Sequence, residues 1–249
     1  MDCVTEDRWI LSRTRYQVTD MTYQLYIGDR TFSSWSLRGW LMLEKFGLPF
    51  QSHLVGLYAG TMAEELAHLA PARTVPVMQT AQGHVVTDSL AMAETLVENH
   101  PDLPLYPRDP AARALARSIT AEMHSSFGAL RTDCPNMIAF RWDGFAPSDD
   151  VLADIQRIET LWELARARHG KGGPWLFGEY SLADVFYAPV ALRITTYGLP
   201  VSEAAQTYVD AHLNDPAFLE WRKAALSETH DPWPYPMALN RKPWPGEES

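Results

Sequence analysis

The chain has 249 residues, 46% of them apolar, and is long enough to bury a core in one large or two modest domains. It carries 21 lysines and arginines against 31 aspartates and glutamates, a net charge of -10. This balance argues against a general nucleic-acid surface, because contacts to phosphate need clustered cations. The two cysteines, Cys3 and Cys134, lie far apart in the sequence and form neither a disulfide framework nor a CxxC redox pair.

The start of the chain shows no export signal. The first twenty residues lack an apolar core followed by small residues, and no run approaches the roughly 18 apolar residues of a membrane span. We therefore expect a cytoplasmic protein with no membrane partner. An organised strand pattern begins at Tyr23, which predicts that residues 1–20 form a flexible extension and makes Met21 an alternative start.

A strand, a helix and a second strand are predicted next. Residues 23–27 alternate and are rich in aromatic and branched side chains, and they stop at Gly28. Residues 37–46 have helical spacing after a serine-rich run, and the helix is predicted to end at Gly47. Residues 50–55 then indicate a second strand.

The next segment combines a proline with a hairpin. Pro76 precedes a short apolar run, a position that suits proline because it cannot donate to a strand ladder. Residues 77–79 and 84–86 flank a short loop that contains Gly83, so they are predicted to pair as a β-hairpin.

A helix is predicted to begin beside this hairpin. Asp88 and Ser89 are cap residues ahead of an apolar helical pattern. The free N–H groups and the positive dipole end of such a helix suit an anion, for example a carboxylate. Over residues 21–100 the order of elements is therefore β-α-β-α-β-β-α, which predicts an α/β domain.

A proline-rich segment separates this part from a helical one. Residues 101–110 contain four prolines without helical spacing, and we place the domain linker there. Residues 111–131 and 149–168 repeat apolar side chains every three or four positions and predict two amphipathic helices. An all-helical domain is expected over residues 111–228, followed by a Pro/Trp-rich tail at 229–249.

Within this helical domain, Ser181 and Asp184 form a variant of the capping box ahead of a mostly apolar helix, so their expected role is structural. The histidines are scattered without ligand spacing, which predicts no metal site. The sequence contains no GxSxG, Walker loop or GxGxxG. Three aromatic residues of the tail are expected to pack in the core: Trp233, Tyr235 and Trp244.

Together these patterns resemble the cytosolic glutathione transferases over roughly residues 21–228. The likeness rests on the V-P pair with its hairpin, the acid-Ser pair, the S-x-x-D box and a P-x-h-x-x-W pattern at 216–221. The resemblance implies a thioredoxin-like β-α-β-α-β-β-α domain followed by an all-helical domain. It also implies glutathione as co-substrate, no metal and a two-fold homodimer.

The family assigns roles to several of these residues. The residue before a cis proline lends its backbone to the cysteinyl part of glutathione, and the acid-Ser pair holds the γ-glutamyl end. These roles fall on Val75, Pro76, Asp88 and Ser89. The side chain that meets the sulfur lies near the first helix, where S-S-W-S-L-R at 33–38 resembles the zeta-class signature S-S-C-x-W-R.

The zeta alignment places the hydroxyl that activates the sulfur at Ser33, with Ser34 and Ser36 as alternatives. Ser36 is alternatively the helix N-cap. Activation is needed because only a few per cent of a thiol is ionised at pH 7. Trp35 stands where the zeta isomerases have cysteine, so maleylacetoacetate isomerase activity does not follow from the resemblance. Arg38 is expected to be a structural salt-bridge partner.

The electrophile site is expected between the domains, where apolar walls and a few polar groups are typical of small-molecule pockets. Two functions fit. One is a serine-type glutathione transferase that presents the thiolate to a hydrophobic or carboxylate-bearing electrophile, for conjugation or isomerisation. The other is a non-catalytic binding or interaction module of the same fold. The predicted lining of the electrophile site is Phe32, Trp35, Arg117, His124, Phe127 and Arg131.

Overall fold

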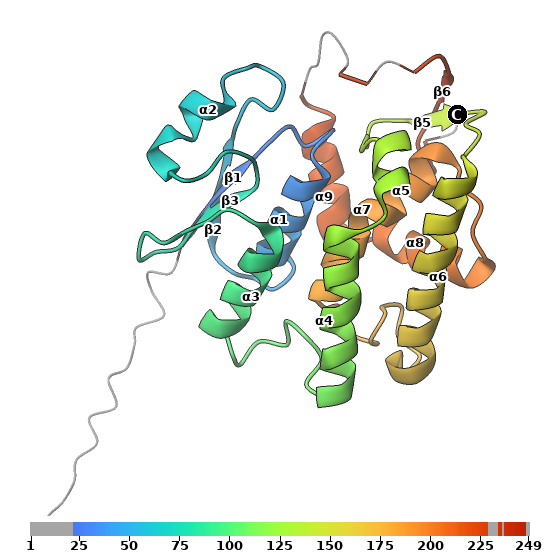
Figure 1. The fold of residues 1–249 in the computed structure, drawn as a ribbon, viewed down its shortest axis with the longest axis horizontal. Coiled ribbons are helices and arrows are strands. Elements are labelled where there is room, and N and C mark those ends of the chain that lie inside the picture. Colours follow the sequence, from blue (N-terminus) through green and yellow to red (C-terminus); the bar gives the residue numbers. More distant parts are fainter. Residues whose placement is uncertain (1–21, 229–233, 236, 248–249) are drawn as a thin grey trace, which may run out of the picture.

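The computed structural model describes residues 22–228, 234–235 and 237–247. The predicted extension at 1–20, the alternative start at Met21 and Trp233 of the tail lie outside the described residues. In Figure 1 the strand-containing part lies on the left and the helical part on the right. No helix within the described residues is long and apolar enough to cross a membrane.

The N-terminal part is built on a four-stranded sheet in the order β2-β1-β3-β4. β1 pairs in parallel with β2 and antiparallel with β3, and β3 pairs antiparallel with β4. The predicted β-α-β-α-β-β-α order is confirmed. The elements are β1 (Tyr23–Ile27), α1 (Ser34–Glu44), β2 (Phe50–Leu54), α2 (Met62–Glu65), η1 (Ala67–Leu69), β3 (Val77–Gln79), β4 (Val85–Val86) and α3 (Ser89–Asn99).

The sheet buries both of its faces. Tyr23, Leu25 and Ile27 alternate along β1 and belong to the main core together with side chains of α1 and α3. Val77 of β3 belongs to a second cluster, which includes Leu66 beside α2. α1 is thus held between the sheet and the helical part of the molecule (Figure 1).

The helical part is organised around α7, whose residues are all buried except Thr195. α7 contacts α1, α4 and α8, so it joins the two parts of the chain. The predicted all-helical second domain is confirmed. Its helices are α4 (Pro110–Ser125), α5 (Gly128–Asp133), α6 (Asp149–His169), α7 (Leu182–Tyr197), α8 (Glu203–Leu213) and α9 (Pro216–Ala225).

Residues 100–109, between α3 and α4, form neither helix nor strand in the structure. The segment is nevertheless packed, because Leu105 is buried and its carbonyl accepts a hydrogen bond of 2.8 Å from the N–H of Leu182. The segment therefore contacts the start of α7. The division of the chain into domains at residues 101–110 stays a prediction.

The single helix predicted over residues 111–131 is wrong. α4 ends at Ser125, and Phe127 adopts a left-handed backbone conformation with φ of 63°. The side chain of Arg131 turns back and donates to the carbonyls of Ser126 and His124 at 2.8 and 3.1 Å. These bonds satisfy carbonyls that the end of a helix leaves free, which stabilises the break.

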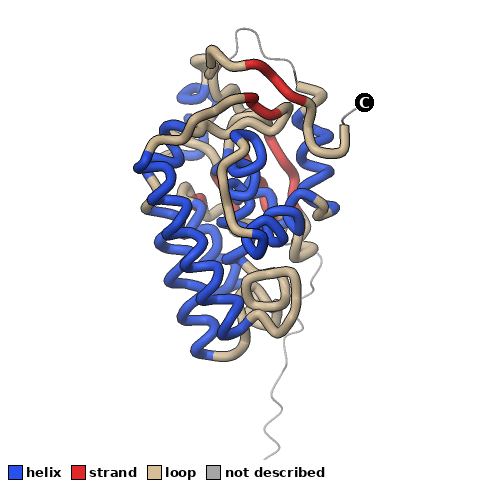
Figure 2. The backbone as a smooth tube through the Cα atoms, turned by 90° about the vertical axis from the view of Figure 1, so that its right-hand side faces the viewer, coloured by secondary structure: helices blue, strands red, loops and turns tan. Residues whose placement is uncertain are grey.

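Two short strands were not predicted. β5 (Arg141–Asp143) pairs antiparallel with β6 (Asn240–Lys242) of the C-terminal tail. The two form a ribbon at one end of the helical part (Figure 2). Trp244 follows β6 and is buried, as expected for the tail aromatics.

The predicted capping box at the start of α7 is present. The carboxylate of Asp184 is completely buried and accepts hydrogen bonds from the N–H of Leu176, the N–H of Ser181 and the hydroxyl of Tyr208, at 3.1, 2.9 and 2.9 Å. Burial raises the pKa of Asp184 to about 6, although these hydrogen bonds lower it. The network ties α7 to α8 and to the loop before it.

Replacement of Asp184 by alanine is therefore expected to destabilise the protein strongly. It leaves buried donors on Leu176, Ser181 and Tyr208 without an acceptor, and we expect the free energy of unfolding to fall by about 3 kcal/mol or more. Denaturant unfolding measures the change. Asp150→Ala is the matched control, because Asp150 is exposed in the first turn of α6. Equal losses in the two variants would contradict the role given to Asp184.

A second prediction concerns acid stability. His212 on α8 is buried against the rings of Tyr208 and Trp175, at 4.7 and 5.1 Å between centroids, and burial lowers the pKa of His212 to about 3. The unfolded chain takes up the proton at a pKa of about 6.5, so this stability is present above pH 6.5 and is lost as the pH falls toward 3.

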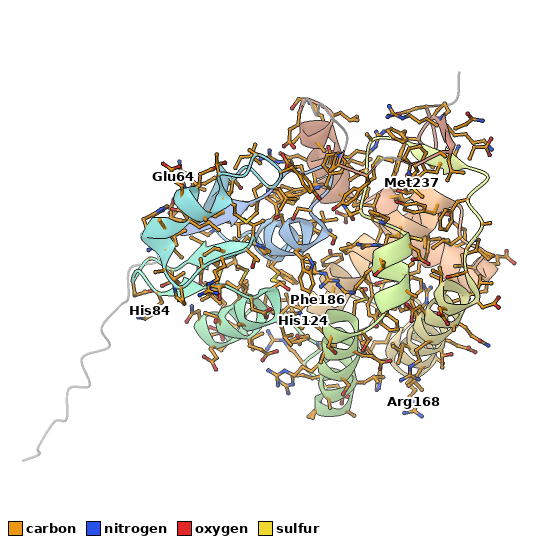
Figure 3. The ribbon with its side chains drawn as sticks, turned by 45° about the horizontal axis from the view of Figure 1, so that its top comes forward. Glu64, His84, His124, Arg168, Phe186 and Met237 are labelled. Carbon is orange, nitrogen blue, oxygen red and sulfur yellow. The ribbon has the colours of Figure 1, made fainter. Side chains whose placement is uncertain are left out.

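Between pH 7.5 and 5 this group alone is expected to remove about 2 kcal/mol from the free energy of unfolding. In His212→Gln the free energy of unfolding, measured by urea unfolding at each pH, should therefore change less between pH 7.5 and 5. His84→Gln is the control, since His84 is exposed on the hairpin (Figure 3). A curve of unchanged slope in His212→Gln would refute the assignment.

Candidate functional site

A cavity of about 670 Å³ lies where the sheet, α1 and the helical part meet. From the N-terminal part it is lined by residues 32–35 and 74–76 and by 87–89. The helical part contributes Arg193 and the start of the segment after α5, including Asn136. The predicted glutathione residues and two of the three candidate serines thus share one cavity.

The peptide bond between Val75 and Pro76 is cis, as the resemblance implied. Both residues line the cavity just before β3. Gly39 of α1 lies against this turn, and a Cβ at that position would meet the Cβ of Pro76 at 3.0 Å. The missing side chain lets α1 approach the turn closely, so Gly39 sets the distance between α1 and the proline loop.

The three serines at the start of α1 are in different environments. Ser33 is the N-cap, correcting the alternative that gave this role to Ser36, and its oxygen accepts from the N–H of Ser36 at 3.2 Å. The hydroxyl of Ser33 donates to that of Ser36 at 2.7 Å. Ser36 is fully buried, accepts from the N–H of Gly28 at 2.9 Å and is not on the cavity wall. Ser33 and Ser34 both line the cavity.

Arg193 of α7 reaches the start of α1. Its Nε donates to the carbonyl of Cys134 at 2.8 Å and its Nη1 to that of Pro189 at 3.2 Å, and its Nη2 lies 3.4 Å from the Oγ of Ser34. Burial and the neighbouring Arg131 lower the pKa of Arg193 to about 10, so it is charged at neutral pH. The cavity therefore has a fixed cation beside Ser34.

Asp88 is the N-cap of α3 and accepts from the N–H groups of Leu90 and Ala91 at 2.8 and 3.1 Å. Its second oxygen lies 3.3 Å from Nε2 of His124. The hydroxyl of Ser89 is buried at the cavity wall and has no hydrogen-bond partner among the described residues. A polar group on a bound molecule would satisfy it.

The salt bridge expected for Arg38 is wrong. Arg38 is fully buried and its guanidinium makes no hydrogen bond within the described part of the chain. It lies over the rings of Trp35 and Phe186, at 4.6 and 5.0 Å from the centroids. Burial lowers the pKa of Arg38 well below its usual range, and Arg131 and Arg193 lower it further.

Three of the six predicted electrophile residues do not line the cavity. The Nη2 of Arg117 pairs with Glu94 at 3.1 Å, and Phe127 is buried in the core. His124 packs against the ring of Trp35 at 5.3 Å and lies beside Phe186 (Figure 3). The break after α4 bears only on Phe127, because Arg117 and His124 both lie within α4. The remaining three predicted residues line the cavity: Phe32, Trp35 and Arg131.

Sequence reasoning missed several cavity residues. The sequence does contain a signal for Arg193, because this charged residue stands within a mostly apolar helix. A charged side chain in such a position requires a specific partner or function. Tyr58 and Asn136 are loop residues without a local pattern, and Tyr235 belongs to a tail whose aromatics were expected only to pack. No cluster of three potential metal ligands occurs among the described residues.

Comparison with known proteins gives consistent matches. Residues 32–99 match the family model of the glutathione S-transferase N-terminal domain. A probable maleylacetoacetate isomerase of Caenorhabditis elegans is 38% identical over 200 residues, covering 78% of this chain and 90% of that protein. A maleylacetoacetate isomerase of Pseudomonas aeruginosa is 36% identical over 217 residues, covering 83% and 98%. A solved glutathione transferase homologue from Burkholderia, with bound glutathione, has a TM-score of 0.62 at 23% identity and covers 83% of this chain and 100% of its own.

The contact between Gly39 and Pro76 predicts an unusual response to alanine. A helical Gly→Ala change ordinarily stabilises by about 1 kcal/mol. At position 39 the new methyl group would lie 3.0 and 3.1 Å from Pro76, so we expect a net loss of about 1–2 kcal/mol on denaturant unfolding. Gly128→Ala is the matched control, because nothing lies within 4 Å of that position. A stabilised Gly39→Ala variant would disprove the close packing.

Proposed function

The chain belongs to the cytosolic glutathione transferase family, and from that premise we propose that it binds reduced glutathione in the cavity lined by Ser34, Val75 and Ser89 and presents its thiolate to a small electrophile. The relatives named maleylacetoacetate isomerase and the Burkholderia homologue with bound glutathione support this proposal. The proposed activity covers both conjugation and glutathione-dependent isomerisation. The proposal also includes a two-fold homodimer, which rests on the family resemblance alone.

The observation that carries the proposal is the meeting of two helix N-termini and a cis proline turn at one cavity. The positive end of α3, with the second carboxylate oxygen of Asp88 and the hydroxyl of Ser89, which has no partner among the described residues, suits the carboxylate and ammonium of a γ-glutamyl group. Val75 lines the same cavity, and we assign its backbone to the cysteinyl amide on the family resemblance. The start of α1 then lies where the sulfur would be.

We propose that Ser34 donates the hydrogen bond to the sulfur. A serine hydroxyl has a single hydrogen to donate, and that of Ser33 is directed to Ser36. The oxygen of Ser34 instead accepts from Arg193, which leaves its hydrogen available to a ligand in the cavity. Ser33, which the zeta alignment favoured, then acts chiefly as the helix N-cap.

Arg193 strengthens this arrangement. A hydroxyl donor, the positive end of α1 and a nearby guanidinium all favour the charged form of the thiol. A fall of about two units in the pKa of the thiol corresponds to roughly 2.7 kcal/mol of differential stabilisation. With Arg131 on the same wall, the cavity also suits an electrophile that carries a carboxylate.

Ser34→Ala is expected to raise the pKa of the bound thiol by more than one unit, because the donor to the sulfur is lost. The measurement is the pH profile of kcat/KM for a nitro-activated aryl halide at saturating glutathione. At pH 6.5 the rate should fall at least about tenfold. Ser34→Thr keeps a hydroxyl and should recover most of the activity.

Ser33→Ala is the matched control. It removes the N-cap and should lower the free energy of unfolding by about 1 kcal/mol while leaving the pKa of the thiol unchanged. The reverse pattern, with the pH profile shifted only in Ser33→Ala, would return the role to Ser33. Retention on glutathione-agarose without turnover of any electrophile would instead favour a non-catalytic binding module.

A further inference from the structure

His124 belongs to the last turn of α4, yet its side chain reaches the N-terminal part of the molecule. Its Nε2 lies 3.3 Å from Oδ2 of Asp88, at the start of α3. The imidazole packs edge-on against the ring of Trp35 at 5.3 Å and lies 6.3 Å from the ring of Phe186 (Figure 3). His124 is therefore in contact with a cavity residue of the proposed glutathione site, although it does not line the cavity itself.

The surroundings of His124 favour a neutral ring. Its Nδ1 is buried and has no hydrogen-bond partner among the described residues, so a proton there would be an unsatisfied donor. Burial lowers the pKa of His124, Asp88 raises it, and the cations Arg38 and Arg131 lower it. The imidazole is thus neutral at pH 7, and its single N–H is on Nε2, the nitrogen beside Asp88.

The carboxylate of Asp88 is fixed by the helix through one oxygen. Oδ1 accepts from the N–H groups of Leu90 and Ala91 as the N-cap of α3. The side chain is 48% exposed, and the terminal torsion of an aspartate has a broad minimum, so these bonds alone leave Oδ2 free to shift. Oδ2 is the oxygen available to the ammonium of a γ-glutamyl group. An anchor for this oxygen would therefore improve recognition of the ammonium.

A neutral imidazole is suited to be that anchor. It brings one N–H to Oδ2, and a carboxylate oxygen accepts more than one hydrogen bond, so the ammonium can bind to the same oxygen. A cation in the place of His124 would instead pair with the carboxylate and compete with the ammonium. The contact of 3.3 Å is long for a hydrogen bond, so its expected contribution is modest.

The same two helices are joined at a second point, which supplies a control. Nη2 of Arg117 on α4 lies 3.1 Å from Oε2 of Glu94 on α3, and both side chains are exposed. Arg117 precedes His124 by seven residues, two helical turns, so both lie on the face of α4 that is turned toward α3. Neither Arg117 nor Glu94 lines the cavity.

We propose that His124 is a positioning residue of the glutathione site: its neutral imidazole donates from Nε2 to Oδ2 of Asp88 and holds that oxygen for the ammonium of the γ-glutamyl group. The inference rests on the proposed binding of glutathione. It gives α4, a helix of the second part of the chain, a share in recognising the glutamyl end. It also states that the N–H of His124, and not the bulk of its ring against Trp35, supplies the effect.

The test measures two affinities by calorimetry, one for glutathione and one for glutaryl-cysteinylglycine, in which hydrogen replaces the α-amino group. His124→Phe keeps a ring against Trp35 but removes the donor. We expect its affinity for glutathione to fall about fivefold, the effect of one hydrogen bond of ordinary strength, and its affinity for the analogue to change by less than about twofold. His124→Gln keeps an N–H donor and should bind glutathione within about twofold of the wild type.

Arg117→Gln is the matched control, because it breaks the exposed pair between the same helices and should leave both affinities unchanged. Equal losses for the two ligands in His124→Phe would mean a packing role and overturn the proposal. A glutathione affinity in His124→Gln as low as in His124→Phe would do the same. If His124→Phe does not fold, His124→Leu, which also lacks a donor, provides the comparison.

The two proposals fail in different ways. If the wild-type protein binds neither glutathione nor the analogue, the proposed function itself is wrong. If it binds both with equal affinity, the ammonium is not recognised through Asp88, and only the role given to His124 is wrong. Tighter binding of glutathione than of the analogue, reduced in His124→Phe and kept in His124→Gln, is the result that supports the proposal.

Discussion

The position of α1 is the constraint on which the site depends. Gly39 allows one side of the helix to approach Pro76, and Trp40 packs against Trp221 of α9 with 5.4 Å between ring centroids. On a third side Arg38 lies over Phe186 of α7. Because α1 is held from the sheet, α7 and α9 at once, the serines at its start occupy fixed positions relative to the proline turn and Arg193.

The second constraint is charge. Arg131 and Arg193 lower the pKa of Arg38, and Arg131 lowers that of Arg193. Hydrogen bonds from Arg131 and Arg193 go mostly to backbone carbonyls. Asp88 and Asp154 compensate part of this positive charge, and an anion bound in the cavity would compensate more of it. A bound thiolate and a substrate carboxylate would supply that negative charge, so ligand binding and the stability of the site are coupled.

Much of the fold could be predicted because its signals are local. The capping box of Ser181 and Asp184, the hairpin after Pro76 and the N-cap of α3 each depend on residues within a few positions of one another, and all are present. The break after α4 could not be predicted in this way. It depends on the side chain of Arg131 folding back onto carbonyls of the preceding helix, which apolar spacing does not reveal.

The ribbon of β5 and β6 shows the same limit at long range. The two strands are about a hundred residues apart in the sequence, and each is only three residues long. Neither strand therefore has a sequence pattern from which its pairing partner could be predicted. Tyr235 was accordingly expected to pack, and its place beside the cavity follows only from the path of the tail. Contacts between distant segments thus brought Tyr235 to the cavity wall, where local sequence patterns had not placed it.

The choice among the serines shows why a motif locates a segment more reliably than an atom. The run at 33–36 correctly marks the start of α1, yet each hydroxyl has one hydrogen, and its direction depends on neighbours outside the motif. Ser36 accepts from the N–H of Gly28 and is not on the cavity wall, and the hydroxyl of Ser33 donates to that of Ser36. Ser34 meets Arg193, which comes from a helix 159 residues away. In the proposed arrangement, the packing of α7 on α1 therefore decides which hydroxyl is left for a ligand.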